Sequence, residues 1–109
     1  MRTLKFIVDR QTIKKDPSCD FSGLVKGSEG YLQVQFSFSR EWNNCAKVAG
    51  FHSTTGVEYK PQVLDGMGCC VIPKEALKKQ SFIIQVFGKR DGYFILTNKI
   101  TIVQDGGRQ

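Results

Sequence analysis

The sequence predicts an all-β protein, an Ig-like antiparallel β-sandwich of about seven to eight strands with one short connecting helix. Three observations support this fold class. Residues 32–38 alternate between apolar and polar side chains without a break, as a strand does when only one face packs on a core. Turn residues separate short apolar segments at intervals of about eight to twelve residues. The eight Phe, three Tyr and one Trp also favour strands.

The length and composition predict one domain. The chain has 109 residues, of which 40% are hydrophobic and 24% are charged. A chain of this size can bury one core but not two. We therefore expect a single sandwich domain over residues 1–105 and a flexible tail over residues 106–109, where Gly and polar residues follow the last apolar segment.

In the first half of the chain, residues 3–8 are predicted to form a strand, and residues 31–39 form the strand at the centre of the sheet. Between them, residues 11–30 are rich in Ser, Gly, Asp and Lys and are predicted to be a loop, with a short strand near 21–25. Apolar residues within this loop are expected to hold it against the sheet. Residues 45–51, which are mostly small, follow as another strand.

The second half continues the pattern. A strand at residues 57–64 is expected at a sheet edge, because Pro61 lacks a ladder donor. A helix of one to two turns is predicted at 73–79 with Pro73 at its first position. Residues 88–92, GKRDG, are predicted to be a charged turn. The remaining strands are predicted at residues 69–72, 81–87 and 93–103.

The net charge of +6 comes from 16 Lys and Arg against 10 Asp and Glu, and these residues are scattered along the chain. Without a basic tract, the charge does not indicate direct binding to nucleic acid. The sequence also contains no apolar run long enough to span a membrane. The four cysteines, Cys19, Cys45, Cys69 and Cys70, are interpreted as free thiols of a protein made in a reducing cytoplasm.

The sequence predicts no enzymatic activity, no catalytic residue, no cofactor and no metal site. The single histidine, His52, lies in a Ser/Thr/Gly turn, and no Cys/His spacing typical of zinc ligands is present. Ser53, Thr54 and Thr55 are adjacent to it, but a catalytic triad is assembled in space and not by sequence proximity. No phosphate-binding loop or nucleophile motif is found.

Five phrases in a fixed order resemble small β-sandwich structural proteins of tailed bacteriophages and prophages. They are FSFSREW, AKVAGF, VLDGMGCCVIPKEAL, FIIQVFGKRDG and LTNKITIVQDGG. They are similar to the N-terminal domain of the siphophage baseplate upper protein, whose pattern runs F-x-F-x-x-x-W, A-x-F, a V-L-D turn ending in I-P-x-E-x-L, V-x-G, and T-N before the last strand. The resemblance covers residues 31–107, and the segment 11–30 has no counterpart in it.

The resemblance implies a virion structural role of the tail or baseplate type, in which the domain contacts neighbouring subunits. It implies a homo-oligomer that binds other virion proteins, and a location in the virion after synthesis in the bacterial cytoplasm. The residues that carry the motif and are expected in the core or at its turns are Phe36, Phe38, Trp42, Phe51, Ile72, Pro73, Leu77, Gly88, Thr97 and Asn98.

Aromatic and basic residues near strand ends are the candidates for partner contacts. They are Tyr31, Trp42, Tyr59, Lys89, Arg90 and Tyr93. For Trp42 two interpretations stay open, a cap on the core at the strand end and a contact with a partner. Two further functions are also open: a carbohydrate-binding module for host adhesion that uses Trp42 and nearby tyrosines, and a small basic phage inhibitor of a host defence enzyme.

Overall fold

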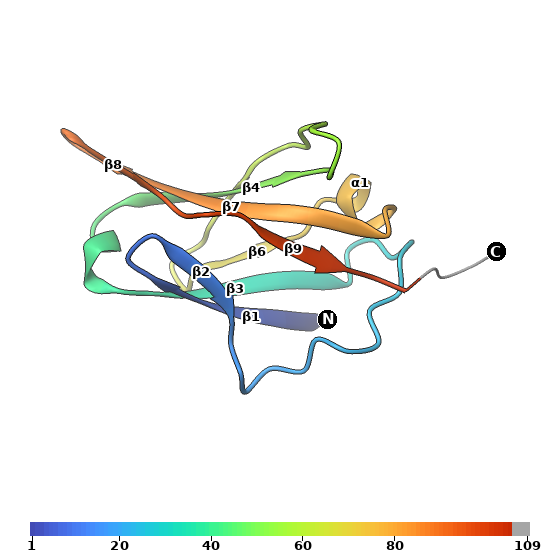
Figure 1. The fold of residues 1–109 in the computed structure, drawn as a ribbon. Helices are drawn as coiled ribbons and strands as arrows, with labels where there is room; N and C mark the ends of the chain where they lie inside the picture. Colours follow the sequence, from blue (N-terminus) through green and yellow to red (C-terminus); the bar gives the residue numbers. More distant parts are fainter. Residues whose placement is uncertain (106–109) are drawn as a thin grey trace.

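The computed structural model describes residues 1–105, which form two stacked β-sheets with one short α-helix at an end (Figure 1). The predicted all-β sandwich is therefore confirmed, and the predicted flexible tail lies outside the described residues. The four-stranded sheet has the order β2-β1-β3-β6. Its strands are β1 (Arg2–Asp9), β2 (Thr12–Lys15), β3 (Leu32–Phe38) and β6 (Cys69–Val71).

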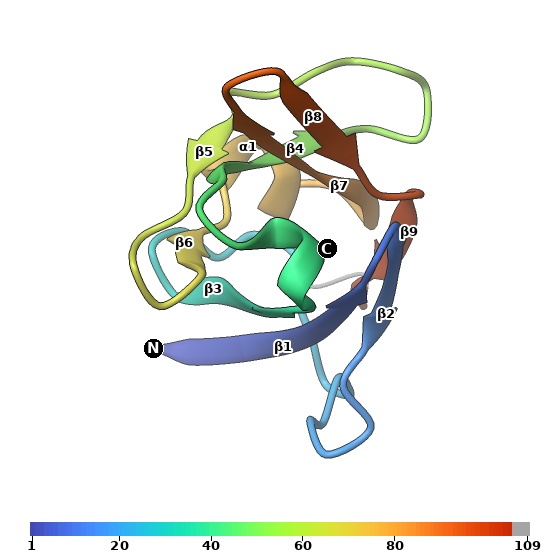
Figure 2. The same ribbon diagram turned by 90° about the vertical axis from the view of Figure 1, so that its left-hand side faces the viewer.

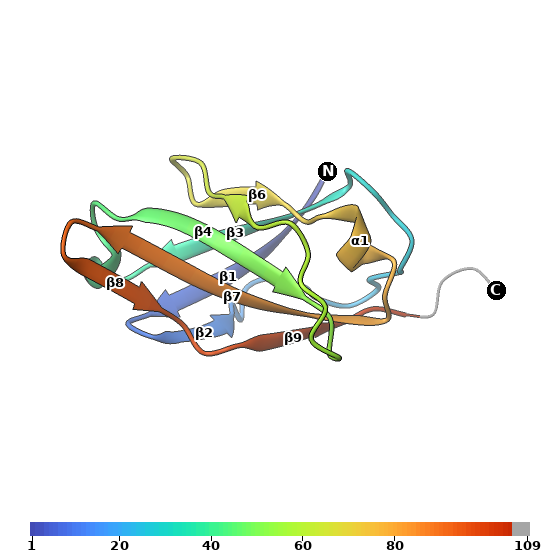
Figure 3. The same ribbon diagram turned by 90° about the horizontal axis from the view of Figure 1, so that it is seen from above.

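The second sheet contains five strands around a long central one. These are β4 (Ala46–His52), β5 (Gln62–Val63), β7 (Ser81–Arg90), β8 (Tyr93–Leu96) and β9 (Ile100–Val103). β4 pairs with one side of β7, while β8 and β9 pair in succession with its other side. Figure 3 looks onto the outer face of this sheet.

The core lies between the two sheets and follows the predicted alternation. In β3, Leu32, Val34 and Phe36 are buried, while Gln33 and Gln35 are only half-buried. β1 and β7 contribute their own buried rows to the same interior. These rows are Leu4, Phe6 and Val8 from β1, and Phe82, Ile84 and Val86 from β7. The sandwich is thus held together by side chains that alternate along each strand, as the period of two requires.

The first sheet differs from the prediction because it is not wholly antiparallel. β1 pairs with β3 in parallel, with Phe6 opposite Phe36. Residues 12–15, predicted to be loop, form β2 and turn the chain back along β1 after a bend at Arg10, whose φ is 57°. The long connection that follows returns the chain to the end where β1 begins, so β3 must run in the same direction as β1.

The connection between β2 and β3 contains no regular strand. The strand predicted near residues 21–25 is reduced to one bridge between Val25 and Asp105. Two apolar side chains hold the segment against the core, as expected: Leu24 is buried, and the ring of Phe21 meets that of Phe6 edge-on with 5.3 Å between centroids.

Three boundaries in the second half are corrected. The strand predicted at 57–64 shortens to β5, which follows Pro61 and does lie at the sheet edge. The helix α1 (Lys74–Leu77) is shorter than predicted, and Pro73 is its N-cap instead of its first helical residue. The turn predicted at 88–92 shrinks to two residues because β7 continues to Arg90, so Gly88 lies within a strand.

A 3-10 turn, η1 (Arg40–Trp42), leads from β3 to β4 and lies between the two layers at one end of the sandwich (Figure 2). Its placement brings Trp42 into the interior, where the side chain is fully buried. This end of the core is closed by the turn, while α1 lies at the opposite end (Figure 1).

Candidate interaction surface and polar pocket

Trp42 is a core residue. Its indole Nε1 donates a hydrogen bond of 2.7 Å to the backbone carbonyl of Arg10, and its ring lies 5.1 Å from that of Phe38. Space for the indole exists because Gly88 has no side chain: a Cβ there would lie 2.7 Å from two indole carbons. The core interpretation is confirmed, and the prediction of Trp42 as a partner contact or sugar platform is wrong.

Arg90 and Tyr93 have contacts within the chain. The Arg90 guanidinium lies 3.9 Å from the centre of the Tyr93 ring and donates a hydrogen bond of 2.6 Å to the carbonyl of Asn43. The Tyr93 hydroxyl donates to the carbonyl of Glu41 at 2.9 Å. These bonds tie the β7–β8 hairpin to η1, so both side chains have a structural role; their use by a partner stays a prediction.

The other predicted contact residues do not join them in one patch. Tyr31 is 50% exposed at the start of β3, the end of that strand far from Arg90 and Tyr93. Lys89 is exposed on the outer face of the five-stranded sheet, opposite Phe94. Tyr59 is half-buried in a pocket near α1. The structure therefore places Tyr31, Lys89 and Tyr59 in three separate regions.

The motif residues have packing or hydrogen-bonding roles. Thr97 is fully buried where the last strand breaks between β8 and β9; its hydroxyl accepts the Val86 N–H at 3.1 Å and donates to the carbonyl of Asn98 at 2.7 Å. Asn98 reaches the other sheet, because its side-chain oxygen accepts the Ile13 N–H at 2.9 Å. The remaining motif residues other than Phe38, which is half-buried, are buried: Phe36, Phe51, Ile72, Pro73 and Leu77.

A row of apolar side chains crosses the outer face of the five-stranded sheet. The register places Val63 beside Val48, Val48 beside Phe87, and Phe87 beside Leu96, on four adjacent strands. Phe94 stacks on Phe87, with 6.4 Å between ring centres. Val63 is 76% exposed, Phe94 60% and Leu96 37%. These five residues, named here the outer row, form the candidate interaction surface.

The outer row was missed from the sequence. Each strand contributes only one or two of its members, so no single segment displays it. A signal was nevertheless present: in residues 81–87 the positions facing away from the core include Ile83 and Phe87, which are apolar. A strand with apolar residues on both faces has a second surface to cover.

A hollow of about 230 Å³ lies beside the outer row. It exists partly because Gly50 lacks a side chain, and the ring of Phe87 lies 2.9 Å from where its Cβ would be. His52, Glu58 and Lys99 also line the hollow. The hollow and Lys89 thus lie on opposite sides of the outer row along the strand direction.

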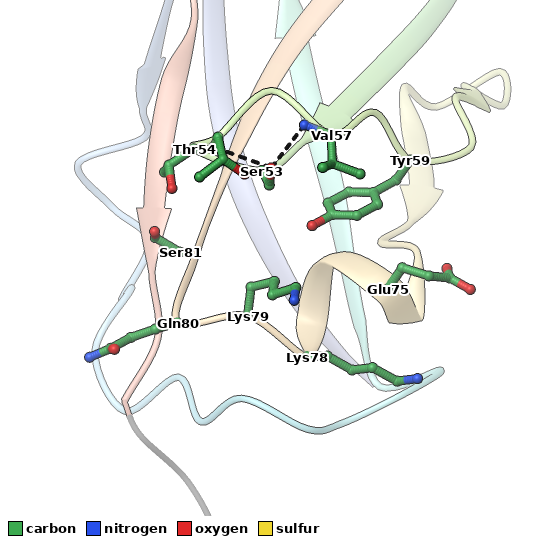
Figure 4. A pocket seen from close by; sticks show the side chains of 10 residues that line it. Ser53, Thr54, Val57, Tyr59, Glu75, Lys78, Lys79, Gln80 and Ser81 are labelled. Carbon is green, nitrogen blue, oxygen red and sulfur yellow. Dashed lines mark hydrogen bonds between the residues drawn. The ribbon is translucent and has the colours of Figure 1, made fainter.

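A larger pocket, of about 580 Å³, lies at the end of the sandwich between the loop after β4 and the segment from α1 to β7 (Figure 4). The loop is fixed by Ser53, whose buried hydroxyl accepts the N–H groups of Thr55 at 3.2 Å and Val57 at 2.9 Å. Tyr59 lines the pocket, and its hydroxyl oxygen is buried without a hydrogen-bond partner in residues 1–105. Lys79 lies across the pocket from this loop.

The groups with metal-binding or nucleophilic chemistry are dispersed. In the part of the chain that the structure describes, no three His, Cys, Asp or Glu side chains come together, and no helix is long and apolar enough to cross a membrane. His52 is on the outer face of β4, whereas the next residue, Ser53, is buried and its hydroxyl accepts a hydrogen bond from Val57 within its own loop. Adjacency in the sequence therefore does not produce a His–Ser pair.

The four cysteines are free thiols. Burial, together with the neighbouring Cys69 and Asp65, raises the pKa of the Cys70 thiol to about 12. Burial and Asp65 also raise the pKa of Cys69. A thiol that stays protonated is a poor nucleophile and a poor metal ligand.

Comparison with known protein families, with curated proteins and with solved structures finds no match for this chain. The resemblance to phage baseplate proteins therefore stays a prediction.

Proposed function

We propose that the chain is a non-enzymatic structural module of a tailed phage or prophage particle, of the tail or baseplate type, and that it works through protein–protein contacts, including contacts with copies of itself. The observation that carries the proposal is the outer row. A sandwich needs only its inner faces for its core, and an apolar row across four strands on an outer face is typical of a contact surface. The sequence resemblance supports the virion as the place of this contact.

The exposed area indicates how strong the self-contact is. Complete burial of a Val, Leu or Phe side chain stabilises by about 1.5–3 kcal/mol. Val63, Leu96 and Phe94, which are 76%, 37% and 60% exposed, then offer roughly 3 kcal/mol per copy and roughly twice that in a symmetric pair. Association costs at least about 4 kcal/mol in lost motion. We therefore expect a weak, concentration-dependent association in solution that becomes stable when further subunits add contacts.

Charge favours one orientation of the pair. Lys89 lies on one side of the outer row, and Glu58 and Lys99, whose charges offset each other in the lining of the hollow, lie on the other. A two-fold axis parallel to the row brings the Lys89 side of one copy over the Glu58 side of the second. An axis parallel to the strands instead brings the Lys89 side over itself, so the first orientation is preferred.

Light scattering coupled to size-exclusion chromatography, over a range of protein concentrations, tests this proposal. Leu96→Glu places a carboxylate in the outer row and should abolish the association. Val71→Glu is the matched control, because Val71 is 40% exposed, close to the 37% of Leu96, but lies on the other sheet. Mass spectrometry of purified virions tests the location. A protein that is monomeric at every concentration and absent from particles would falsify the proposal.

A further inference from the structure

The pocket of about 580 Å³ near α1 is separate from the outer row and has a feature that the fold does not explain. The Tyr59 hydroxyl oxygen is buried, yet it has no hydrogen-bond partner in residues 1–105. Buried polar groups are nearly always paired, because an unpaired one loses its hydration without compensation. The Tyr59 backbone is held in place by an N–H···O bond of 2.9 Å to Phe51, so the ring is positioned by β4 and not by its hydroxyl.

A positive charge faces the same space. Figure 4 shows the Lys79 side chain pointing toward the region under the Tyr59 ring, while the side chains of Glu75, Lys78 and Gln80, which also line the pocket, point outward. Lys79 forms no ion pair within residues 1–105. Its backbone is fixed, because the buried Gln104 side chain donates a 2.8 Å hydrogen bond to the Lys79 carbonyl.

The opposite wall is preformed and rich in hydroxyl groups. Ser53 and Thr55 share a hydrogen bond of 2.9 Å between their side-chain oxygens, and Ser53 also fixes the Val57 backbone. The side chain of Val57, which is 59% exposed, adds an apolar patch beside the Tyr59 ring. The pocket therefore combines two lysines and one glutamate with a phenol group, aliphatic hydroxyls and an apolar surface.

We propose that this pocket binds an acidic saccharide unit. The carboxylate of the sugar accepts a hydrogen bond from the Lys79 ammonium, and a small rotation of the Tyr59 ring lets its buried hydroxyl donate to the same carboxylate and gain the partner that it lacks. The sugar hydroxyls meet Thr55 and Ser81, and the C–H face of the ring lies on Val57 and Tyr59. The volume lies within the range of about 300–1,000 Å³ for small-molecule sites and exceeds what a bare inorganic anion needs. The sequence predicted a sugar site at Trp42 and nearby tyrosines, and the site proposed here contains Tyr59 and not the buried Trp42.

NMR titration of the ¹⁵N-labelled full chain with glucuronate tests the site. We expect saturable shifts in residues 53–59 and 75–81, with a dissociation constant in the millimolar range. Lys79→Gln should weaken binding about tenfold or more, because a charge-assisted hydrogen bond is lost. Tyr59→Phe removes one oxygen and should weaken binding about fivefold. Lys74→Gln is the matched control, since it removes the same charge from an exposed residue of α1 that does not line the pocket, and it should change binding less than about twofold.

Two further ligands separate the sources of binding. Glucose lacks the carboxylate and should bind at least about tenfold more weakly than glucuronate. Sulfate carries the charge without the sugar, so binding as tight as that of glucuronate would identify a simple anion site and overturn the saccharide proposal. The proposal also fails if no shifts appear in these segments, or if Lys79→Gln and Lys74→Gln bind equally well. The outer row takes no part in this test, and its failure leaves the proposed protein contacts untouched.

Discussion

Replacing Gly88 with alanine should destabilise the protein by about 2 kcal/mol, because Gly88 makes room for Trp42. A Cβ at position 88 would lie 2.7 Å from two indole carbons and 3.1 Å from a methyl carbon of Ile95. Non-bonded carbon atoms normally lie about 3.5–4.0 Å apart. The indole must therefore shift by most of an ångström or the two sheets must separate.

Both movements cost free energy. The indole is fully buried, packs on Phe38, and donates its N–H to the carbonyl of Arg10 at 2.7 Å. Overpacking of this kind costs about 1–3 kcal/mol, and loss of the hydrogen bond adds about 1 kcal/mol. Replacing a strand glycine returns about 0.5–1 kcal/mol by restricting the unfolded chain. The net expectation of about 2 kcal/mol follows from these three contributions.

Urea unfolding followed by fluorescence and circular dichroism measures the effect, and Trp42 is the only tryptophan in the chain. Gly50→Ala is the matched control: its Cβ would lie 2.9 Å from the Phe87 ring, but that ring is half-buried on the outer face and can move, so the cost should stay below about 1 kcal/mol. In a Trp42→Phe background, Gly88→Ala should cost at least about 1 kcal/mol less than it does in the natural chain. An equal cost in both backgrounds would refute the reasoning.

Three further predictions concern single groups. Thr97→Val leaves the buried Val86 N–H without its partner and should lower the free energy of unfolding by about 2 kcal/mol in urea titrations, and an unchanged value would contradict the assigned role. Asn98→Ala removes the acceptor of the Ile13 N–H and should cost about 1 kcal/mol, whereas Asn98→Asp keeps an acceptor oxygen and should cost less; equal losses would exclude the bond as the cause. The unfolded Cys70 thiol ionises with its ordinary pKa of 9.0, whereas the folded thiol stays protonated to about pH 12. The free energy of unfolding should therefore fall above pH 9, by up to about 1.4 kcal/mol per pH unit. Cys70→Ala should remove this part of the slope, and an identical slope in both proteins would count against the raised pKa.

The strands with strict alternation could be predicted from the sequence, because burial of every second residue is a local property. Residues 32–38 show this most clearly. β2 was missed because its four residues include one buried apolar side chain, Ile13, and edge strands are often polar. The parallel pairing of β1 with β3 was missed for the same reason, because β2 decides from which end the chain re-enters the sheet.

The candidate sites were harder to predict than the fold. The partner contacts expected at Trp42, Arg90 and Tyr93 are side chains that the structure uses in closing its own end, and a single strand-end aromatic does not reveal which side it faces. The outer row arises only when the register aligns residues from four strands. The Tyr59 pocket depends on how a loop and a helix approach each other, which no residue spacing encodes.

Two glycines on neighbouring strands give the five-stranded sheet different properties on its two faces. Gly88 in β7 faces the core and admits Trp42, which closes the interior; Gly50 in β4 faces outward and leaves the hollow beside Phe87. A methyl group at the first should therefore reduce stability, whereas a methyl group at the second should alter the outer row while the core stays intact. If Gly50→Ala changes self-association and Gly88→Ala changes only unfolding, then the inner face of this sheet specifies the fold and its outer face specifies the contact. If both variants act only on unfolding, the outer row is a packing feature of the isolated chain, and the proposed contact must lie on another surface.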